Sequence, residues 1–246
     1  LGVLAGHDPA DPGSQAQDVP DYRDDLDGGV HGLRVAVCRN HFFDKVQPAV
    51  AQAVEGAIRW FSAAGAVVSE IRIPSLAYSL GAIFAIELSS STAYHDASLR
   101  AGRTARYSPD VRRLVELGRF VTGPDYLKAE QYRHVLMQDF KRVFETNDVV
   151  IGPTLPVTAP RCGEMVISVG GEQESTLAAT WRLTYPYNLA GLPAISLPCG
   201  FDEAGLPIGL QIAGKPFDET TVLRTAHAYE AGHDWKDCRP ADPKES

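Results

Sequence analysis

Residues 33–73 read LRVAVCRNHFFDKVQPAVAQAVEGAIRWFSAAGAVVSEIRI, and this stretch decides the fold. Its two ends, residues 33–38 and residues 66–73, are rich in β-branched side chains, as β-strands are. Between them, residues 47–64 place apolar side chains at helical spacing, and Gly65 supplies a stop for the helix. Such a strand–helix–strand unit predicts a parallel or mixed sheet with helices on its faces. The apolar helical positions are Val50, Val54, Ile58 and Phe61.

The rest of the chain continues this α/β pattern on both sides of the unit. Residues 7–29 are acidic, rich in Pro and Gly and without a period, which predicts an irregular connector. Residues 153–175 are expected to be irregular as well. Further helices are expected over residues 78–100, 109–119 and 125–145 and after the N-cap Asp218, and further strands over residues 149–152, 194–197 and 207–213.

Composition excludes several classes of function. The 246 residues carry a formal net charge of −8, which argues against a nucleic-acid binder that relies on clustered Lys and Arg. No apolar run approaches the ~20 residues that a membrane helix needs, so no membrane partner is expected. The four cysteines lack metal-site spacing and are expected to be reduced thiols of a cytoplasmic protein.

Three chemical motifs fail on inspection. Residues 209–215 fit a phosphate-binding GxxxxGK pattern, but Pro216 stands where a magnesium-binding hydroxyl is required. Ser91 and His95 share a helix face, yet a hydrolase serine normally sits on a tight turn beside an oxyanion hole. The histidines show no HExxH or paired ligand spacing, so we predict no metal and no cofactor.

Several segments in order resemble the amidase-signature family. The most specific resemblance is residues 187–200, YNLAGLPAISLPCG, followed by residues 205–217, GLPIGLQIAGKPF. DVVIGPTLP at residues 148–156 and LAGHDP at residues 4–9 support it. The resemblance covers about residues 1–232 and implies the C-terminal half of such an enzyme, with half of a mixed β-sheet flanked by helices. It divides the chain into a connector from a missing N-terminal half (1–32), the C-terminal half of the α/β domain (33–232) and a charged tail (233–246).

The resemblance also implies a reaction, hydrolysis of a carboxamide through a serine acyl-enzyme with a second serine and a lysine. In the family, the Gly- and Ser-rich segment that carries the nucleophile precedes the part matched here. This sequence contains no such segment, so it offers no catalytic residue. We therefore expect the chain by itself to be inactive.

Substrate preference follows from three apolar positions. By alignment with glutamine-using amidotransferase subunits, which hold their substrate with Asp, Arg and Tyr, these positions are Trp181, Leu114 and either Leu80 or Ile83. A pocket for a charged amino acid would leave the ligand charges unpaired here, so we predict an apolar or aromatic amide. Trp181, Tyr185 and Tyr187 are the expected pocket walls, and burial of Trp181 in the core is the open alternative.

Two other functions stay open at this point. The chain could be a non-catalytic binding module, or a glutamine-dependent amidotransferase subunit with a partner protein. The expected partners are a small amide substrate and the missing N-terminal half, with a homodimer as a further option.

Overall fold

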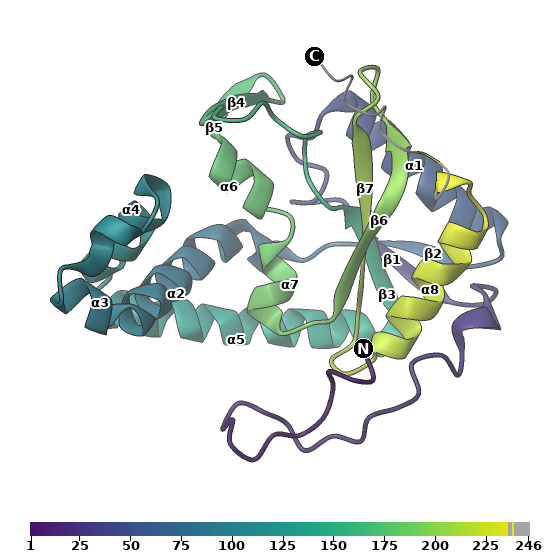
Figure 1. Ribbon diagram of the computed structural model, residues 1–246. Helices are drawn as coiled ribbons and strands as arrows, with labels where there is room; N and C mark the ends of the chain where they lie inside the picture. Colours follow the sequence, from purple (N-terminus) through teal and green to yellow (C-terminus); the bar gives the residue numbers. More distant parts are fainter. Residues whose placement is uncertain (236–237, 239–246) are drawn as a thin grey trace, which may run out of the picture.

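The computed structural model describes residues 1–235 and 238, and its centre is a five-stranded sheet with helices on both faces (Figure 1). The strand order is β2-β1-β3-β7-β6. The expected α/β fold with a mixed, helix-flanked sheet is confirmed. The strands are β1 (Arg34–Cys38), β2 (Val67–Ile71), β3 (Val149–Pro153), β6 (Ala194–Phe201) and β7 (Pro207–Gly214).

The strand–helix–strand unit predicted from residues 33–73 is present. β1 pairs in parallel with β2, with Arg34 opposite Val67, and helix α1 (Pro48–Ala63) connects them. Proline is favoured at the first position of a helix, because its missing N–H would have no partner there. Gly65 reverses the chain after α1 with a φ of +90°, a backbone conformation that suits glycine.

The other strands make the sheet mixed. β3 is parallel to β1 but antiparallel to β7, and β7 pairs antiparallel with β6. A turn joins β6 to β7, where the side chain of Asp202 accepts hydrogen bonds from the backbone of Ala204 and Leu206. Because residues 207–214 form β7, the GxxxxGK-like stretch is a strand and not a phosphate loop.

The middle of the chain is helical, as predicted, with one difference. The expected helix over residues 78–100 is divided into α2 (Ser79–Tyr94) and α3 (Asp96–Arg100). His95, with φ −91° and ψ 6°, leaves the helical conformation, and its ring shares a hydrogen bond with the Tyr107 hydroxyl. The other expected helices are also present: α4 (Pro109–Leu117), α5 (Gly123–Thr146) and α8 (Glu219–Ala231). The 3-10 turns η2 (Pro74–Tyr78), η3 (Arg103–Arg106) and η4 (Gly118–Phe120) accompany them.

Residues 153–175 are not irregular throughout, so that expectation was wrong. Strands β4 (Val166–Val169) and β5 (Glu172–Ser175) form an antiparallel hairpin. Gly170 and Gly171 make its two-residue turn with φ of 59° and 83°, the arrangement that type I′ hairpins require. Two short helices that the sequence did not reveal follow the hairpin, α6 (Thr176–Trp181) and α7 (Tyr185–Ala190).

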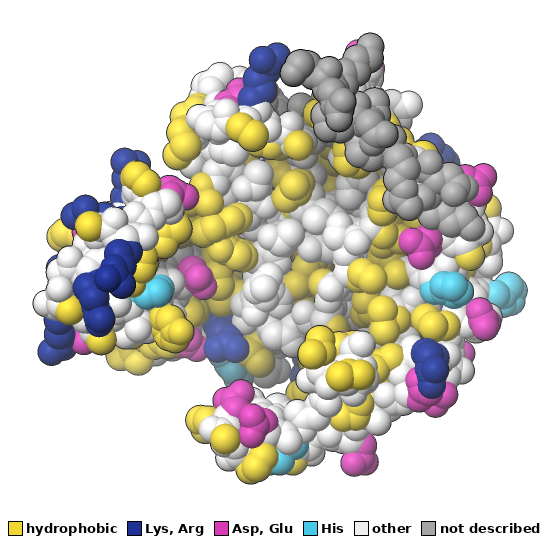
Figure 2. All heavy atoms as spheres, viewed as in Figure 1, with side chains coloured by type: hydrophobic (Ala, Val, Ile, Leu, Met, Phe, Trp, Pro, Cys, Tyr) yellow, Lys and Arg dark blue, Asp and Glu magenta, His cyan; other side chains and the backbone are white. Residues whose placement is uncertain are grey.

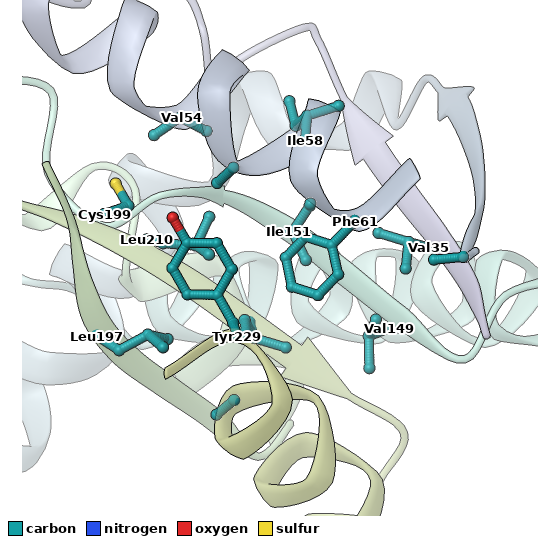
Figure 3. Packing of buried hydrophobic residues seen from close by; sticks show 14 of the residues in the cluster. Val35, Val54, Ile58, Phe61, Val149, Ile151, Leu197, Cys199, Leu210 and Tyr229 are labelled. Carbon is teal, nitrogen blue, oxygen red and sulfur yellow. The ribbon is translucent and has the colours of Figure 1, made fainter. Parts of the chain in front are cut away.

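The sheet separates two hydrophobic cores. The first core lies between the sheet and helices α1 and α8, where Phe61 and Tyr229 stack (Figure 3). All four predicted inward positions of α1 are buried in it. The second core lies on the other face, under α2, α5 and α7, and contains Leu136, Phe140 and Tyr187. Figure 1 shows this division, with α1 and α8 on one side of the sheet and α2, α5 and α7 on the other.

Residues 1–29 run along the outside, with one 3-10 turn, η1 (Leu26–Gly28), and Val30 and Leu33 then enter the first core. Arg224 of α8 ties this segment down through an ion pair with Asp25. The division of the chain at residues 32 and 232 stays a prediction. Most of the predicted charged tail, residues 236–237 and 239–246, lies outside the described residues.

A carboxylate joins the ends of three strands. Asp148, directly before β3, accepts hydrogen bonds from the backbone and guanidinium of Arg34 at the start of β1. It also accepts one from Lys215, directly after β7, at 3.3 Å. The hydrogen bonds from Arg34 are the main cause that lowers the pKa of Asp148 to about 2 from its ordinary 3.8.

This carboxylate should make stability depend on pH in acid. Because folding lowers the pKa of Asp148, its contribution is present above pH ~4 and lost as the pH falls towards 2. We expect Asp148→Asn to lower the free energy of unfolding by about 1 kcal/mol at pH 7, a modest value because the partners are partly exposed. Urea unfolding of both proteins at pH 7 and near pH 2.5 measures this, and the difference should shrink in acid. A pH-independent difference would contradict the charge argument, and exposed Asp24→Asn serves as the control.

Candidate functional site

The topology of the sheet marks one edge as a place for a ligand. After β1 the chain enters α1 beside the first core, whereas after β3 it passes through the β4–β5 hairpin and α6 before it reaches α7 beside the second core. Where neighbouring parallel strands diverge in this way, the carboxyl ends of the strands leave a crevice in which α/β proteins bind ligands. Two segments meet at that edge, which we call the switch-point edge: residues 39–47, the β1–α1 loop, and residues 154–158.

Hydrogen bonds hold these two segments together. The backbone N–H of Gln47 donates to the Pro156 carbonyl at 2.8 Å, and the Gln47 side chain accepts from the Thr158 backbone at 3.0 Å. Phe42 of the same loop stacks on Tyr187 of α7, with ring centroids 5.4 Å apart. The switch-point edge is therefore in contact with α7.

Three aromatic rings form a wall beside this edge, which we call the aromatic wall: Phe84, Trp181 and Tyr185. The rings of Trp181 and Tyr185 lie 4.7 Å apart, and Phe84 of α2 lies 5.5 Å from Trp181. All three side chains are half-buried, so each keeps some surface open. Figure 2 shows hydrophobic side chains gathered on this face, beside α2, α6 and α7.

The electrostatics of the wall suit a neutral ligand. Burial, with a smaller contribution from the negative charge of Glu87, raises the pKa of Tyr185 to about 12. The phenol therefore stays protonated at neutral pH and cannot act there as a base. A nearby carboxylate such as Glu87 would also repel a negatively charged ligand.

The structure brings some of the predicted substrate-binding residues together and separates others. Trp181 and Tyr185 are in ring contact, and half-buried Leu80 lies one helical turn from Phe84 on α2. Half-buried Leu114 lies on α4, which meets α2 near Thr92, whose hydroxyl donates to the Val115 carbonyl at 2.6 Å. About 18 Å of helix lies between residues 80 and 92, so Leu80 lies at one end of α2 and α4, which carries Leu114, meets α2 near the other end.

Two of the aromatic or apolar candidates are core residues. Tyr187, expected as a pocket wall, is 2% exposed and packs in the second core between Phe42 and Phe140. Ile83, the alternative to Leu80, is 7% exposed in the same core. Neither side chain is available to line an open pocket.

One polar group next to the aromatic wall, the guanidinium of Arg182, was not predicted from the sequence. Arg182 follows Trp181 directly and reaches into the β1–α1 loop, where its guanidinium donates to the carbonyls of His41 and Lys45 at 3.0 Å each. Burial lowers the pKa of Arg182 and, in the same way, that of His41. No local sequence pattern indicates this contact, because Arg182 and its partners are 137 and 141 positions apart in the sequence.

Among the described residues, we find a surface that could bind a ligand but no reactive thiolate and no group of metal ligands. Burial raises the pKa of the Cys38 thiol to about 11 and that of Cys199 to about 12, so neither is a thiolate at neutral pH. Among the residues that the structure describes, no three His, Cys, Asp or Glu side chains are grouped for a metal ion. No described helix is long and apolar enough to span a membrane.

Fold and site together define an α/β unit with an apolar wall at its switch-point edge, and comparison with known proteins places it in a family. The amidase family model matches residues 1–223. The chain is also 41% identical over 241 residues to an amidase of Pseudomonas putida. This protein therefore belongs to the amidase-signature family, as its motifs indicated.

Two further relatives show how far the similarity extends. A glutamyl-tRNA(Gln) amidotransferase subunit of Halalkalibacterium halodurans is 38% identical over 264 residues, which covers 98% of this chain and 53% of that protein. A solved chain from a vestigial complex linked to the origins of an s-triazine catabolic enzyme superposes with a TM-score of 0.86 at 28% identity, over 94% of this chain and 50% of that one. For the amidase of Pseudomonas putida the shares are 98% and 51%. The chain thus spans about half the length of the relatives it matches.

Proposed function

We propose that this chain is the C-terminal part of an amide hydrolase, and that it holds the apolar or aromatic side of the substrate. The observation that carries the proposal is the aromatic wall, with the rings of Trp181 and Tyr185 4.7 Å apart at the switch-point edge. An aromatic ring of a substrate could stack there and gain both buried area and ring contact. The reacting serine and its lysine would come from residues outside this chain.

In the proposed reaction, this chain binds the substrate and the part of the protein outside this chain carries out the bond cleavage. A serine oxygen attacks the amide carbon, the C–N bond breaks, and the amine leaves after it gains a proton. Water then attacks the acyl-enzyme and releases the carboxylic acid. In this scheme the wall holds the substrate's apolar group while the other part does the chemistry, which is why the chain alone should be inactive.

The preference for apolar amides has two supports. The positions that would carry paired charges for an amino-acid substrate are Trp181, Leu114 and Leu80, and charges without partners are costly to bury. Glu87 is the charged residue that acts on the pKa of Tyr185, and its negative charge opposes binding of a free carboxylate.

The free thiols of all four cysteines agree with a reducing, cytoplasmic location.

A turnover assay on the full-length gene product that contains this chain tests the proposal. Benzamide and glutamine are offered separately, to the full-length protein and to the 246-residue chain. We expect ammonia release from benzamide by the full-length protein and none from the chain alone. Glutamine turnover without benzamide turnover would reject the proposal.

The main alternative is a glutamine-using amidotransferase subunit. Its support is the 38% identity to such a protein over 98% of this chain. Faster turnover of glutamine than of benzamide in the same assay would favour it. A full-length product no longer than this chain, inactive on both amides, would instead favour a non-catalytic binding module.

Loss of one ring should weaken binding of an aromatic amide. We expect Trp181→Ala in the full-length protein to raise KM for benzamide about fivefold to tenfold, because a stacked ring contributes about 1 kcal/mol beyond its buried area. Steady-state kinetics against Tyr94→Ala, an exposed aromatic of α2, provide the comparison. An equal effect of the two substitutions would exclude Trp181 from the substrate site.

A further inference from the structure

The connector between α6 and α7, residues 182–184, joins the two rings of the aromatic wall that lie closest together. Its first residue, Arg182, makes hydrogen bonds in both directions with the β1–α1 loop. The guanidinium donates to the carbonyls of His41 and Lys45, and the His41 ring shares a 2.9 Å hydrogen bond with the Arg182 carbonyl. The connector is thus fixed through its backbone and its side chain.

The two carbonyls belong to residues in an unusual backbone conformation. His41 has a φ of 73° and Lys45 a φ of 49°, in the left-handed region that residues other than glycine rarely adopt. Such a conformation persists only where surrounding contacts hold it. Arg182 contacts both strained residues with its forked donors, one Nη to each carbonyl, and its planar guanidinium fixes the directions of both hydrogen bonds, which the rotatable donors of an ammonium do not.

Burial disfavours the charge of the guanidinium and is the main cause that lowers the pKa of Arg182, but two carboxylates oppose this effect. Its positive charge is favoured by Glu174 of the hairpin and by Asp44 of the loop. Asp44 in turn accepts a hydrogen bond from the His41 backbone at 2.8 Å. Among the described residues, Nε of Arg182 has no hydrogen-bond partner, so the two Nη groups carry the contact.

From this geometry we infer that Arg182 is a positioning residue that sets the orientation of Trp181 and Tyr185 by clamping their connector to the β1–α1 loop. The inference rests on the proposed function for the use of the wall, but the clamp itself does not depend on any activity. Because Trp181 precedes Arg182 directly, a connector that moves carries the indole ring with it. Arg182 would then affect the affinity for an aromatic amide through the orientation of Trp181, although Arg182 itself does not contact the amide.

A spectroscopic experiment tests the clamp by itself. The chain has three Trp residues, so Trp60→Phe with Trp235→Phe leaves Trp181 as the reporter. In this background we expect Arg182→Ala to lose the near-UV circular dichroism band of Trp181 and to make the indole more accessible to acrylamide. Ethylguanidinium at millimolar concentration should restore both signals, since it can refill the vacated site.

Matched variants keep the result interpretable. Arg119→Ala removes an exposed arginine of η4 and should leave the Trp181 signals unchanged. Arg182→Lys keeps the charge but loses the planar pair of Nη donors, so we expect a partial loss, and this variant decides if Arg182→Ala does not fold. Trp181 signals that match the parent in both folded Arg182 variants would overturn the inference.

Steady-state kinetics of the full-length protein distinguish failure of the positioning role of Arg182 from failure of the proposed function. We expect Arg182→Lys to raise KM for benzamide about fivefold, with a much smaller change in kcat, as for loss of a binding contact. An unchanged KM together with altered Trp181 signals would overturn the role of Arg182 in substrate binding. A parent protein that does not hydrolyse benzamide would reject the proposed function, while the Trp181 signals would still decide the clamp.

Discussion

Replacement of Gly118 by alanine is expected to lower the free energy of unfolding by about 3 kcal/mol or more. A Cβ atom at this position would lie 2.0 Å from the Leu88 carbonyl oxygen and 2.0 Å from the Thr92 hydroxyl of α2. The Leu88 atom belongs to the backbone of a helix, so α2 and η4 would have to move apart. The hydrogen bond from Thr92 to the Val115 carbonyl would be disturbed by the same movement.

The backbone of Gly118 makes this a test of packing alone. Its φ of −62° and ψ of −16° are helical and suit alanine, so conformational strain adds nothing. Thermal and urea unfolding followed by circular dichroism measure the effect, which should lower Tm by about 10 °C for a chain of this size. A Tm within about 2 °C of the parent would contradict the close approach of η4 to α2.

Gly81→Ala is the matched control, since it makes the same substitution within α2. A Cβ atom there meets nothing within 4 Å. Alanine is favoured over glycine in a helix, so we expect the control to stabilise the protein by about 0.5–1 kcal/mol. Opposite signs at the two positions would show that contact across helices, and not helix propensity, decides the outcome at Gly118.

Truncation of Phe61 should have an effect of similar size in the first core. The side chain is 0% exposed, stacks on Tyr229 at 5.5 Å and meets Trp60 edge to face at 5.1 Å. We expect Phe61→Ala to cost about 3–5 kcal/mol, because the buried ring is lost and the rigid sheet behind it cannot fill the cavity. Ile151 and Leu210 of the sheet belong to the same core, and Figure 3 shows Ile151 beside Phe61 and Leu210 beside Tyr229.

Phe120→Ala provides the comparison for Phe61→Ala. The Phe120 side chain is 80% exposed, so its removal should change the free energy of unfolding by no more than about 0.5 kcal/mol. Urea unfolding of both variants distinguishes buried from exposed rings. Equal losses for the two variants would mean that Phe61 is not in the core between α1 and α8.

Arg182 lies within the short connector whose two ends carry Trp181 and Tyr185, and this links packing to the proposed function. Phe61 lies in the first core, whereas Leu183 of this connector lies in the second core on the other face of the sheet. A loss of stability at Phe61 should therefore leave the Trp181 signals of the folded fraction unchanged. Variants of Arg182 should instead change those signals first.

Local patterns in the sequence determined much of this protein. The strand–helix–strand unit over residues 33–73, the strands β3, β6 and β7, and the helix after Asp218 follow from periodicity and from Gly, Pro and Asp at the ends of elements. Ordered motifs such as residues 187–200 indicated the family. The hairpin at Gly170-Gly171 carried a readable turn signal as well, but its strands have only four residues each and β5 is polar throughout, which hid it.

Only the tertiary structure decided how the site is assembled. It paired Trp181 with Tyr185, moved Tyr187 into the second core, and placed Leu80 and α4, which carries Leu114, at opposite ends of α2. It also brought Arg182 to the left-handed residues His41 and Lys45, a contact across 137 to 141 positions. Local periodicity records which face of an element is buried, but contacts between distant segments depend on how several elements pack together, and no local pattern encodes that.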